Sequence, residues 1–347
     1  MTDTNGEQAR AIMLDFARLT GLDPEGRGPG RYLWTDAFAV CNYVGLWQAT
    51  GDEGLRDLGL RLVDQVHHTL GRHRGDDPRT GWLSGLGEED GESHPTIGGL
   101  RIGKKLPERA LGEPPDERLE WDQDGQYFHY LTKWMHALVI AGRATGDPVF
   151  LRWAAELART AYAGFIHRPR SGGPDRMYWK MSIDLSRPLV ASMGQHDPLD
   201  GLVTFCEIQV ARGTYPAPFL PPDLGEEIAG LAGISQGMDL PTDDPLGTGG
   251  LISDALRIAQ VMVQGGGRFP EQAVPELDLP ALLGEVLNAA LLGLDAFADS
   301  GCTGLPADFR LAFRELGLSI GLSGAGELIR LIDGHPSRFG SGSSLQV

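Results

Sequence analysis

The stretch Ala49-Thr50-Gly51-Asp52 recurs as Ala144-Thr145-Gly146-Asp147, and this repeat decides the fold. In each copy an apolar, aromatic-rich segment precedes the turn and an amphipathic segment follows it. Glycine takes the left-handed conformation that ends a helix, and aspartate caps the amino end of the next one. Each copy therefore predicts an antiparallel pair of helices. The more apolar first helix should be buried, and the second should lie on the outside.

Helical periodicity also dominates the rest of the chain, and alternating runs of the strand type are scarce. We therefore expect an all-α protein of about eleven helices. Long connections rich in glycine, proline or charge occupy 71–121, 168–198 and 234–250. The expected helices cover residues 7–20, 36–50, 52–70, 125–144, 147–166, 199–212, 224–233, 251–264, 279–298, 307–320 and 324–333.

Two clear hairpins and the further helices fit an (α/α)6 toroid, in which hairpins form two concentric rings. The Thr-Gly-Asp turns, together with the Gly/Trp/Tyr-rich segments 81–83 and 177–179, resemble the six-hairpin glycosidase superfamily. The resemblance covers most of the chain and implies a carbohydrate-active enzyme that works with paired carboxylates. We expect a single domain over residues 1–333, with long ordered loops over one mouth, and a flexible tail over 334–347. A solenoid of helices is the alternative architecture.

The composition narrows the possible partners and the location. The 347 residues carry 47 Asp and Glu against 30 Lys and Arg, a formal net charge of −17. Nucleic acids and anionic membranes both attract clustered Lys and Arg, so we expect neither as a partner. Three cysteines stand far apart, which argues against a disulfide framework and a cysteine-rich zinc site. We find no secretory signal and no run of about 18 apolar residues, so we expect a cytoplasmic location.

In a ring of hairpins the inner helices all start at the same mouth, so the segments leading into them carry the strongest functional signal. These approach segments are 31–36, 121–129 and 195–200, and each combines carboxylates with aromatic, His or Arg residues. Cleavage of a glycosidic bond needs two carboxyl groups, one acid and one base or nucleophile. Helix capping explains one acidic residue per segment equally well. The acid/base candidates are Asp36, Asp122, Asp124, Asp197 and Asp200.

Aromatic rings beside these carboxylates favour a sugar ligand, because a flat ring can pack against the C–H face of a pyranose. We expect Trp34, Trp121 and Tyr127 to stack on the sugar, with Arg31 and His196 binding it or moving protons. The segment 178–188 is dense in polar and aromatic groups. It forms a wall of the pocket or a structural loop held by an Asp184–Arg187 pair. The remaining residues expected to bind substrate are Tyr32, His129, Trp179, Lys180 and Arg187.

Two other functions stay open at this point. A sugar epimerase or isomerase on the same scaffold would use His129 and His196 as acid and base. A non-catalytic ligand-binding or scaffold protein would need neither. No nucleotide-binding or zinc-protease motif occurs, so we expect no cofactor and no resident metal, although the acidic segment 85–91 leaves a calcium site open. A small sugar is the one partner that the sequence predicts.

Overall fold

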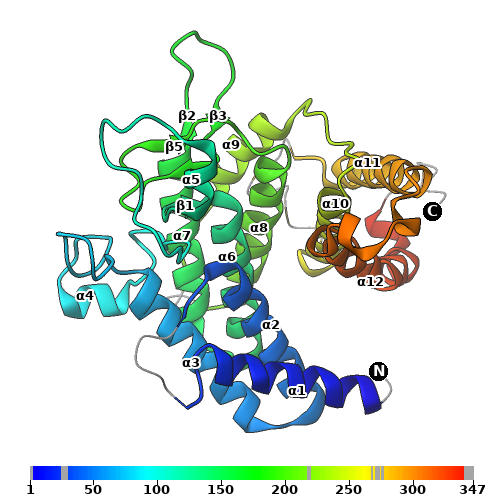
Figure 1. Cartoon of the computed structure of the whole chain (residues 1–347). Coiled ribbons are helices and arrows are strands. Elements are labelled where there is room, and N and C mark those ends of the chain that lie inside the picture. The colour runs from blue at the N-terminus through cyan, green and yellow to red at the C-terminus, as the bar shows by residue number, and fades with distance from the viewer. Residues whose placement is uncertain are drawn as a thin grey trace. The chain divides into compact units, whose positions relative to one another are not determined.

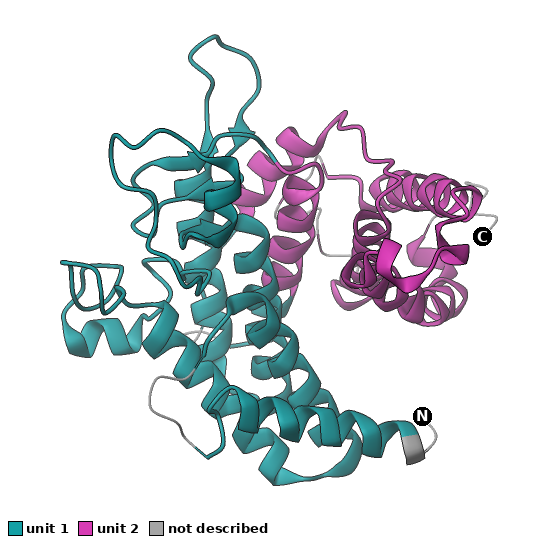
Figure 2. Cartoon of the chain, in the orientation of Figure 1, with its two compact units in different colours: residues 1–193, 211–224 teal, residues 194–210, 225–347 magenta. Residues whose placement is uncertain are grey.

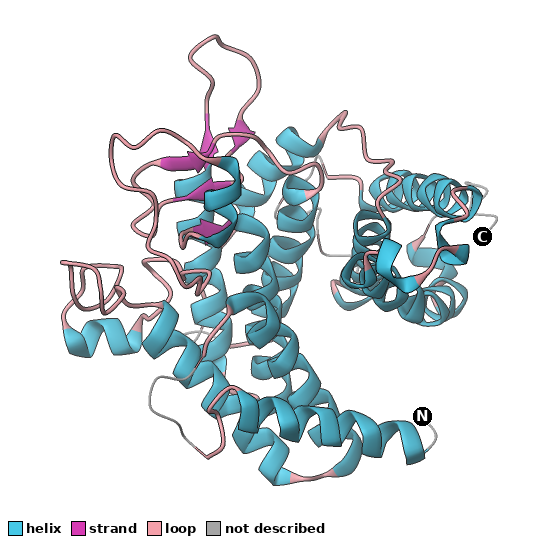
Figure 3. Cartoon of the chain, viewed as in Figure 1, coloured by secondary structure: helices cyan, strands magenta, loops and turns pink. Residues whose placement is uncertain are grey.

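The computed structural model describes residues 3–24, 30–216, 220–266, 269, 274 and 277–339. Helices dominate this part of the chain and the strands are short, which confirms the all-α class (Figure 1, Figure 3). The long helices are α1 (Asp3–Leu19), α2 (Leu33–Thr50), α3 (Glu53–Leu70), α6 (Phe128–Thr145), α7 (Pro148–Phe165), α8 (Asp197–Arg212), α9 (Gly225–Ser235), α10 (Pro245–Gln264), α11 (Leu279–Asp299) and α12 (Ala312–Gly334).

Both repeated turns form the predicted hairpins, α2–α3 and α6–α7. Gly51 and Gly146 end the first helices with φ of 73° and 75°. Asp52 and Asp147 then cap the second helices, accepting hydrogen bonds from backbone N–H groups two residues ahead. Helix α2 packs against α6 as well as α3, so the first helices of the two hairpins are neighbours. The hairpin prediction is confirmed.

The glycine-rich helices near the carboxyl end differ from the prediction. Helix α12 is one continuous helix where two were expected over 307–320 and 324–333. Helix α10 begins at Pro245, inside the predicted 234–250 connection. Glycine lowers helix propensity but lets two backbones approach closely. A Cβ on Gly249 of α10 would stand 2.2 Å from the Gly317 carbonyl oxygen of α12. Close packing thus outweighs the local preference.

The chain forms two compact units (Figure 2). Unit 1 contains residues 1–193 and 211–224, and unit 2 contains residues 194–210 and 225–347. The expectation of a single domain over 1–333 stays a prediction. Within the expected tail, Pro336–Arg338 forms a short 3-10 helix, and residues 340–347 lie outside the described part of the chain.

A small sheet fastens the second long connection to the start of α6. Strand β1 (Gln126–Tyr127) pairs antiparallel with β4 (Lys180–Met181), which pairs antiparallel with β5 (Pro188–Val190). Strands β2 (Ile166–His167) and β3 (Arg176–Met177) form a separate hairpin. The first long connection contains two short helices that the sequence did not predict, α4 (Glu88–Ser93) and α5 (Glu117–Asp122). Both long connections therefore contain ordered helices or strands in unit 1.

Helix α11 bears on the expectation that no helix of this chain crosses a membrane. By length and mean hydropathy this helix is apolar enough to cross a bilayer. In its most apolar stretch of 18 residues, 28% is buried inside the structure. Glu285 and Asp295 interrupt its apolar residues, so the helix contains no uninterrupted apolar run of about 18 residues. A single helix of this kind is weak support for membrane insertion, because core helices of soluble proteins pass the same test.

Candidate functional site

The starts of α2 and α6 are held together by one stretch of the first long connection. The Leu33 N–H donates to the Ile102 carbonyl oxygen at 3.0 Å, and the Ile102 N–H donates to the Gly125 carbonyl oxygen at 2.8 Å. Approach segments 31–36 and 121–129 therefore meet in unit 1. The third approach segment, 195–200, belongs to unit 2, and its meeting with the other two stays a prediction.

Side chains from both approach segments, together with Tyr130 of α6 and Trp179 just before β4, build an aromatic cluster. Trp179 lies 5.3 Å from Trp121 and 5.4 Å from Tyr127, measured between ring centroids. Trp34 lies 5.0 Å from Tyr130, whose hydroxyl is 2.5 Å from the Tyr32 hydroxyl. The structure thus brings together six residues expected to bind substrate, with Tyr130 added. We define the aromatic cluster as Tyr32, Trp34, Trp121, Tyr127, His129, Tyr130 and Trp179.

Much of this cluster is open to solvent. Trp121 is 55% exposed, and Trp34, His129 and Trp179 are half-buried. The His129 ring stacks on Tyr127 with an interplanar angle of 27°. A partly exposed set of flat rings is suited to stacking on a planar or pyranose ligand. Each exposed ring face offers apolar surface to the ligand, and the fixed orientation of the ring sets the direction of stacking.

Asp36 lies buried in the first turn of α2, only 1% exposed. Its Oδ2 accepts a hydrogen bond from the Tyr32 N–H at 3.0 Å, so it fastens the start of the helix. Arg31, also buried, lies 3.6 Å away from Oδ1. Burial raises the pKa of the Asp36 carboxyl to about 7, and the nearby Arg31 charge only partly offsets that rise. Asp36 is therefore a carboxylic acid that can hold a proton near neutral pH.

Asp124 anchors the loop between the two helix starts. Its fully buried carboxylate lies 2.5 Å from the Arg101 guanidinium and 3.2 Å from that of Arg74. Its other oxygen, Oδ1, accepts from the N–H groups of Gly103, Lys104 and Gly125. Five donors leave this carboxylate little capacity for a ligand. The geometry favours a structural role for Asp124, whereas Asp122 is exposed two residues earlier.

Lys180 is a fully buried residue that contacts the aromatic cluster at Tyr127. Its ammonium donates to the carbonyl oxygens of Glu120 and Gln123 and lies 3.1 Å from the Glu120 carboxylate. Burial lowers the pKa of this lysine, against the opposing charge of Glu120. All three N–H bonds are used, and the Nζ lies 5.5 Å from the Tyr127 ring centroid. The fully buried Lys180 therefore positions rings and is closed to a ligand in this conformation.

The segment around Arg187 is a structural wall in this geometry. The Arg187 guanidinium donates to the Arg109 carbonyl oxygen. Asp184 lies 2.7 Å from Arg79, so the expected Asp184–Arg187 pair is replaced by one that reaches the first long connection. The two long connections are thereby tied to each other.

The third approach segment has its own network within unit 2. The Nε2 of His196 lies 2.7 Å from the Leu240 carbonyl oxygen, and burial lowers the pKa of this histidine. The ring is therefore neutral, with its Nε2 proton donated to that carbonyl. Asp197 begins α8, and the buried Asp200 lies 3.2 Å from Arg257 of α10. This geometry fixes His196 and Asp200 in place.

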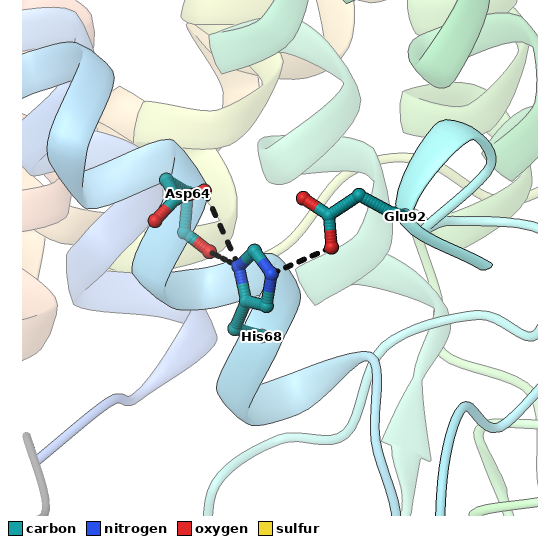
Figure 4. Close-up of side chains that lie close together, drawn as sticks. All are labelled: Asp64, His68 and Glu92. Atoms are coloured by element: carbon teal, nitrogen blue, oxygen red, sulfur yellow. Dashed lines mark hydrogen bonds and ion pairs between the residues drawn. The ribbon is translucent and has the colours of Figure 1, made fainter. Parts of the chain in front are cut away.

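Among the residues that the structure describes, one group of side chains has ligand atoms close enough for a metal ion. Asp64 and His68 of α3 and Glu92 of α4 offer atoms within 4.8 Å of one another (Figure 4). Both nitrogens of His68 are already engaged, Nδ1 with Asp64 and Nε2 with Glu92 at 2.8 Å. Burial favours a lower pKa for His68, but its bonds to the Asp64 carbonyl and Glu92 outweigh it and raise the pKa. The group therefore forms a bridge between α3 and α4.

Sequence reasoning missed the residues of the first long connection that join the site. Arg74, Arg101 and Lys104 come from a segment that carries no helical period. The one available signal was the basic stretch 101–105 in a strongly acidic chain. No family model, no curated protein and no solved structure significantly matches this chain. Any assignment of function to this protein therefore rests on the geometry of the site.

Proposed function

We propose that this protein is a carbohydrate-active enzyme that binds a small sugar at the aromatic cluster and hydrolyses a glycosidic bond. The observation that carries the proposal is the gathering of seven rings from three separate segments at the starts of α2 and α6. Rings of this kind present apolar faces to sugar C–H groups, while neighbouring polar groups bind hydroxyls.

Two carboxyl groups from the same approach segments fit the roles that hydrolysis needs. Asp36, whose pKa burial raises to about 7, is the proton donor to the leaving oxygen. Asp122 is an exposed carboxylate beside Trp121 and is the base or nucleophile. Because Asp36 is only 1% exposed, the proposal requires the start of α2 to open locally when the sugar binds.

The proposal includes the (α/α)6 toroid, with α2 and α6 as neighbouring inner helices and α3 and α7 outside them. The packing of α2 against α6, and the backbone hydrogen bonds through Ile102 that join their starts, support this assignment. We further propose a cytoplasmic enzyme, in keeping with three cysteines that form no disulfide, and no nucleic-acid or membrane partner.

A sugar epimerase is the second candidate, and the position of His129 favours it. This imidazole lies inside the aromatic cluster, stacked on Tyr127 and 6.2 Å from Trp179. A proton acid or base held against a sugar-binding surface suits proton abstraction beside a carbonyl.

The test combines binding and product analysis on a panel of oligosaccharides. Replacing Trp179 by alanine should abolish binding, whereas replacing Trp47, a half-buried tryptophan near the other end of α2, should leave it unchanged. Hydrolysis should stop in Asp36→Asn and Asp122→Asn and persist in His129→Ala; loss confined to His129→Ala with an epimerised product would favour the second candidate. Failure of every sugar to bind the wild-type protein would refute the proposal.

A further inference from the structure

The loop residue Lys104 is fixed at the edge of the aromatic cluster by its backbone. The neighbouring Gly103 has φ of +91°, and a Cβ there would stand 2.3 Å from the Arg31 carbonyl oxygen. The loop can therefore lie directly against the start of α2 only with glycine at this position. The Lys104 N–H donates to Asp124, and the Lys104 carbonyl accepts from Arg74 at 2.6 Å. Hydrogen bonds therefore fix both the N–H and the carbonyl group of Lys104.

The side chain of Lys104 points toward the rings. Its Nζ lies over the Tyr32 ring, 5.4 Å from the centroid, and the residue is half-buried. Tyr32 in turn meets Tyr130 edge to face, with 5.6 Å between centroids. A cation over an aromatic face is attracted by the ring and still has N–H groups to offer a ligand. Lys104 therefore places a half-buried ammonium beside Tyr32, at the edge of the cluster.

The neighbouring cations differ from Lys104 in that each has a carboxylate. Arg31 lies beside Asp36, Arg101 beside Asp124, and Lys180 beside Glu120. Within the described ranges, Lys104 makes no ion pair. Lys104 thus carries a positive charge without a carboxylate partner, even though Asp and Glu outnumber Lys and Arg in this chain by 47 to 30. Its charge is also felt at Lys180, whose pKa is lowered first by burial and further by Lys104.

We infer that the sugar bound at the aromatic cluster carries an anionic group, a carboxylate or a phosphate, and that Lys104 binds it. The inference rests on the proposed carbohydrate site and adds the chemical class of its ligand. An ammonium beside a stacking surface discriminates an acidic sugar from its neutral counterpart through a charge-assisted hydrogen bond. Asp124 and Arg74 hold the lysine ready, so little ordering is needed on binding.

The experiment is a glycan array with neutral, uronate-containing and phosphorylated oligosaccharides, followed by calorimetry on the matched pairs that bind. The wild-type protein should prefer an anionic glycan over its neutral counterpart, and the array decides between carboxylate and phosphate. Lys104→Met keeps the stem on Tyr32 but removes the charge, and it should weaken anionic binding by about tenfold or more. Lys104→Arg should restore part of the affinity, and added salt should reduce the preference.

Lys105 provides the matched control, because it is the next residue, exposed, with no ring contact in the described structure. Lys105→Met should leave the preference unchanged, and a melting curve should show that both variants fold. Equal wild-type binding of neutral and anionic glycans, or an unchanged preference in Lys104→Met, would overturn the inference while the sugar site stands. Absence of any glycan binding would overturn the sugar site and this inference together.

Discussion

Replacing Asp36 by asparagine should remove a pH dependence of stability that the wild-type protein shows between about pH 4 and pH 7. The pKa of this carboxyl rises from 3.8 to about 7 on folding, chiefly because burial disfavours the anion. A folded-state pKa above the unfolded one stabilises the fold fully at low pH, and this contribution is lost as pH rises through the folded value. A rise of roughly three pH units, at about 1.4 kcal/mol each, gives a loss of about 4 kcal/mol.

The seven tryptophans all lie in residues 1–193, so their fluorescence reports the unfolding of unit 1 alone. Urea titrations at a series of pH values would give the free energy of unfolding of the wild-type protein and of Asp36→Asn. The difference between the wild-type and Asp36→Asn curves removes the contributions that the two proteins share, and the exposed Asp122→Asn serves as the matched control. Parallel curves for wild type and Asp36→Asn would refute the buried-acid account and with it the role of Asp36 as proton donor.

Three further predictions concern the loop and the bridge around the site. Asp124→Asn should cost about 3 kcal/mol of stability, since it breaks a buried ion pair, while Asp122→Asn should cost under about 0.5 kcal/mol; urea titration compares them. Gly103→Ala should destabilise unit 1 more than Gly112→Ala in thermal melts, because both glycines have positive φ but only Gly103 lacks room for a Cβ. His68→Gln should destabilise more at pH 6 than at pH 9, because the pKa of His68 is raised in the fold and its contribution is lost as pH rises; equal effects at both pH values would contradict the charged bridge.

The sequence was sufficient for elements whose signals are local. The repeated turn places a left-handed glycine and a capping aspartate in adjacent positions, and these two interactions need no distant partner. It was insufficient where packing decides the outcome. Helix α12 continues through Gly317 and Gly321 because they contact the backbone of α10, and α5 is held through Glu120 by Lys180 and Arg109.

The same distinction governs the site. Rings beside a helix start can be found from their position, and six of the predicted ligand-binding residues do lie together. The use of each carboxylate could not be found, because capping, anchoring and catalysis all place acidic residues at a helix start. The partners that separate these uses, such as Arg101 and Lys104, lie in a connection without periodicity.

Asp36 and Asp124 stand at the starts of neighbouring helices, yet their surroundings assign them opposite roles. Asp124 is bound by two arginines and three backbone N–H groups, so its negative charge is fully compensated and its geometry is fixed. Asp36 receives one N–H bond, and its arginine is 3.6 Å away, so burial outweighs the attraction and favours the protonated form. Pairs of titratable groups in such different environments are how a site separates an acid from a fixed charge. If hydrolysis takes place here, the proton must therefore come from α2, while the start of α6 supplies the anchor that presents Lys104.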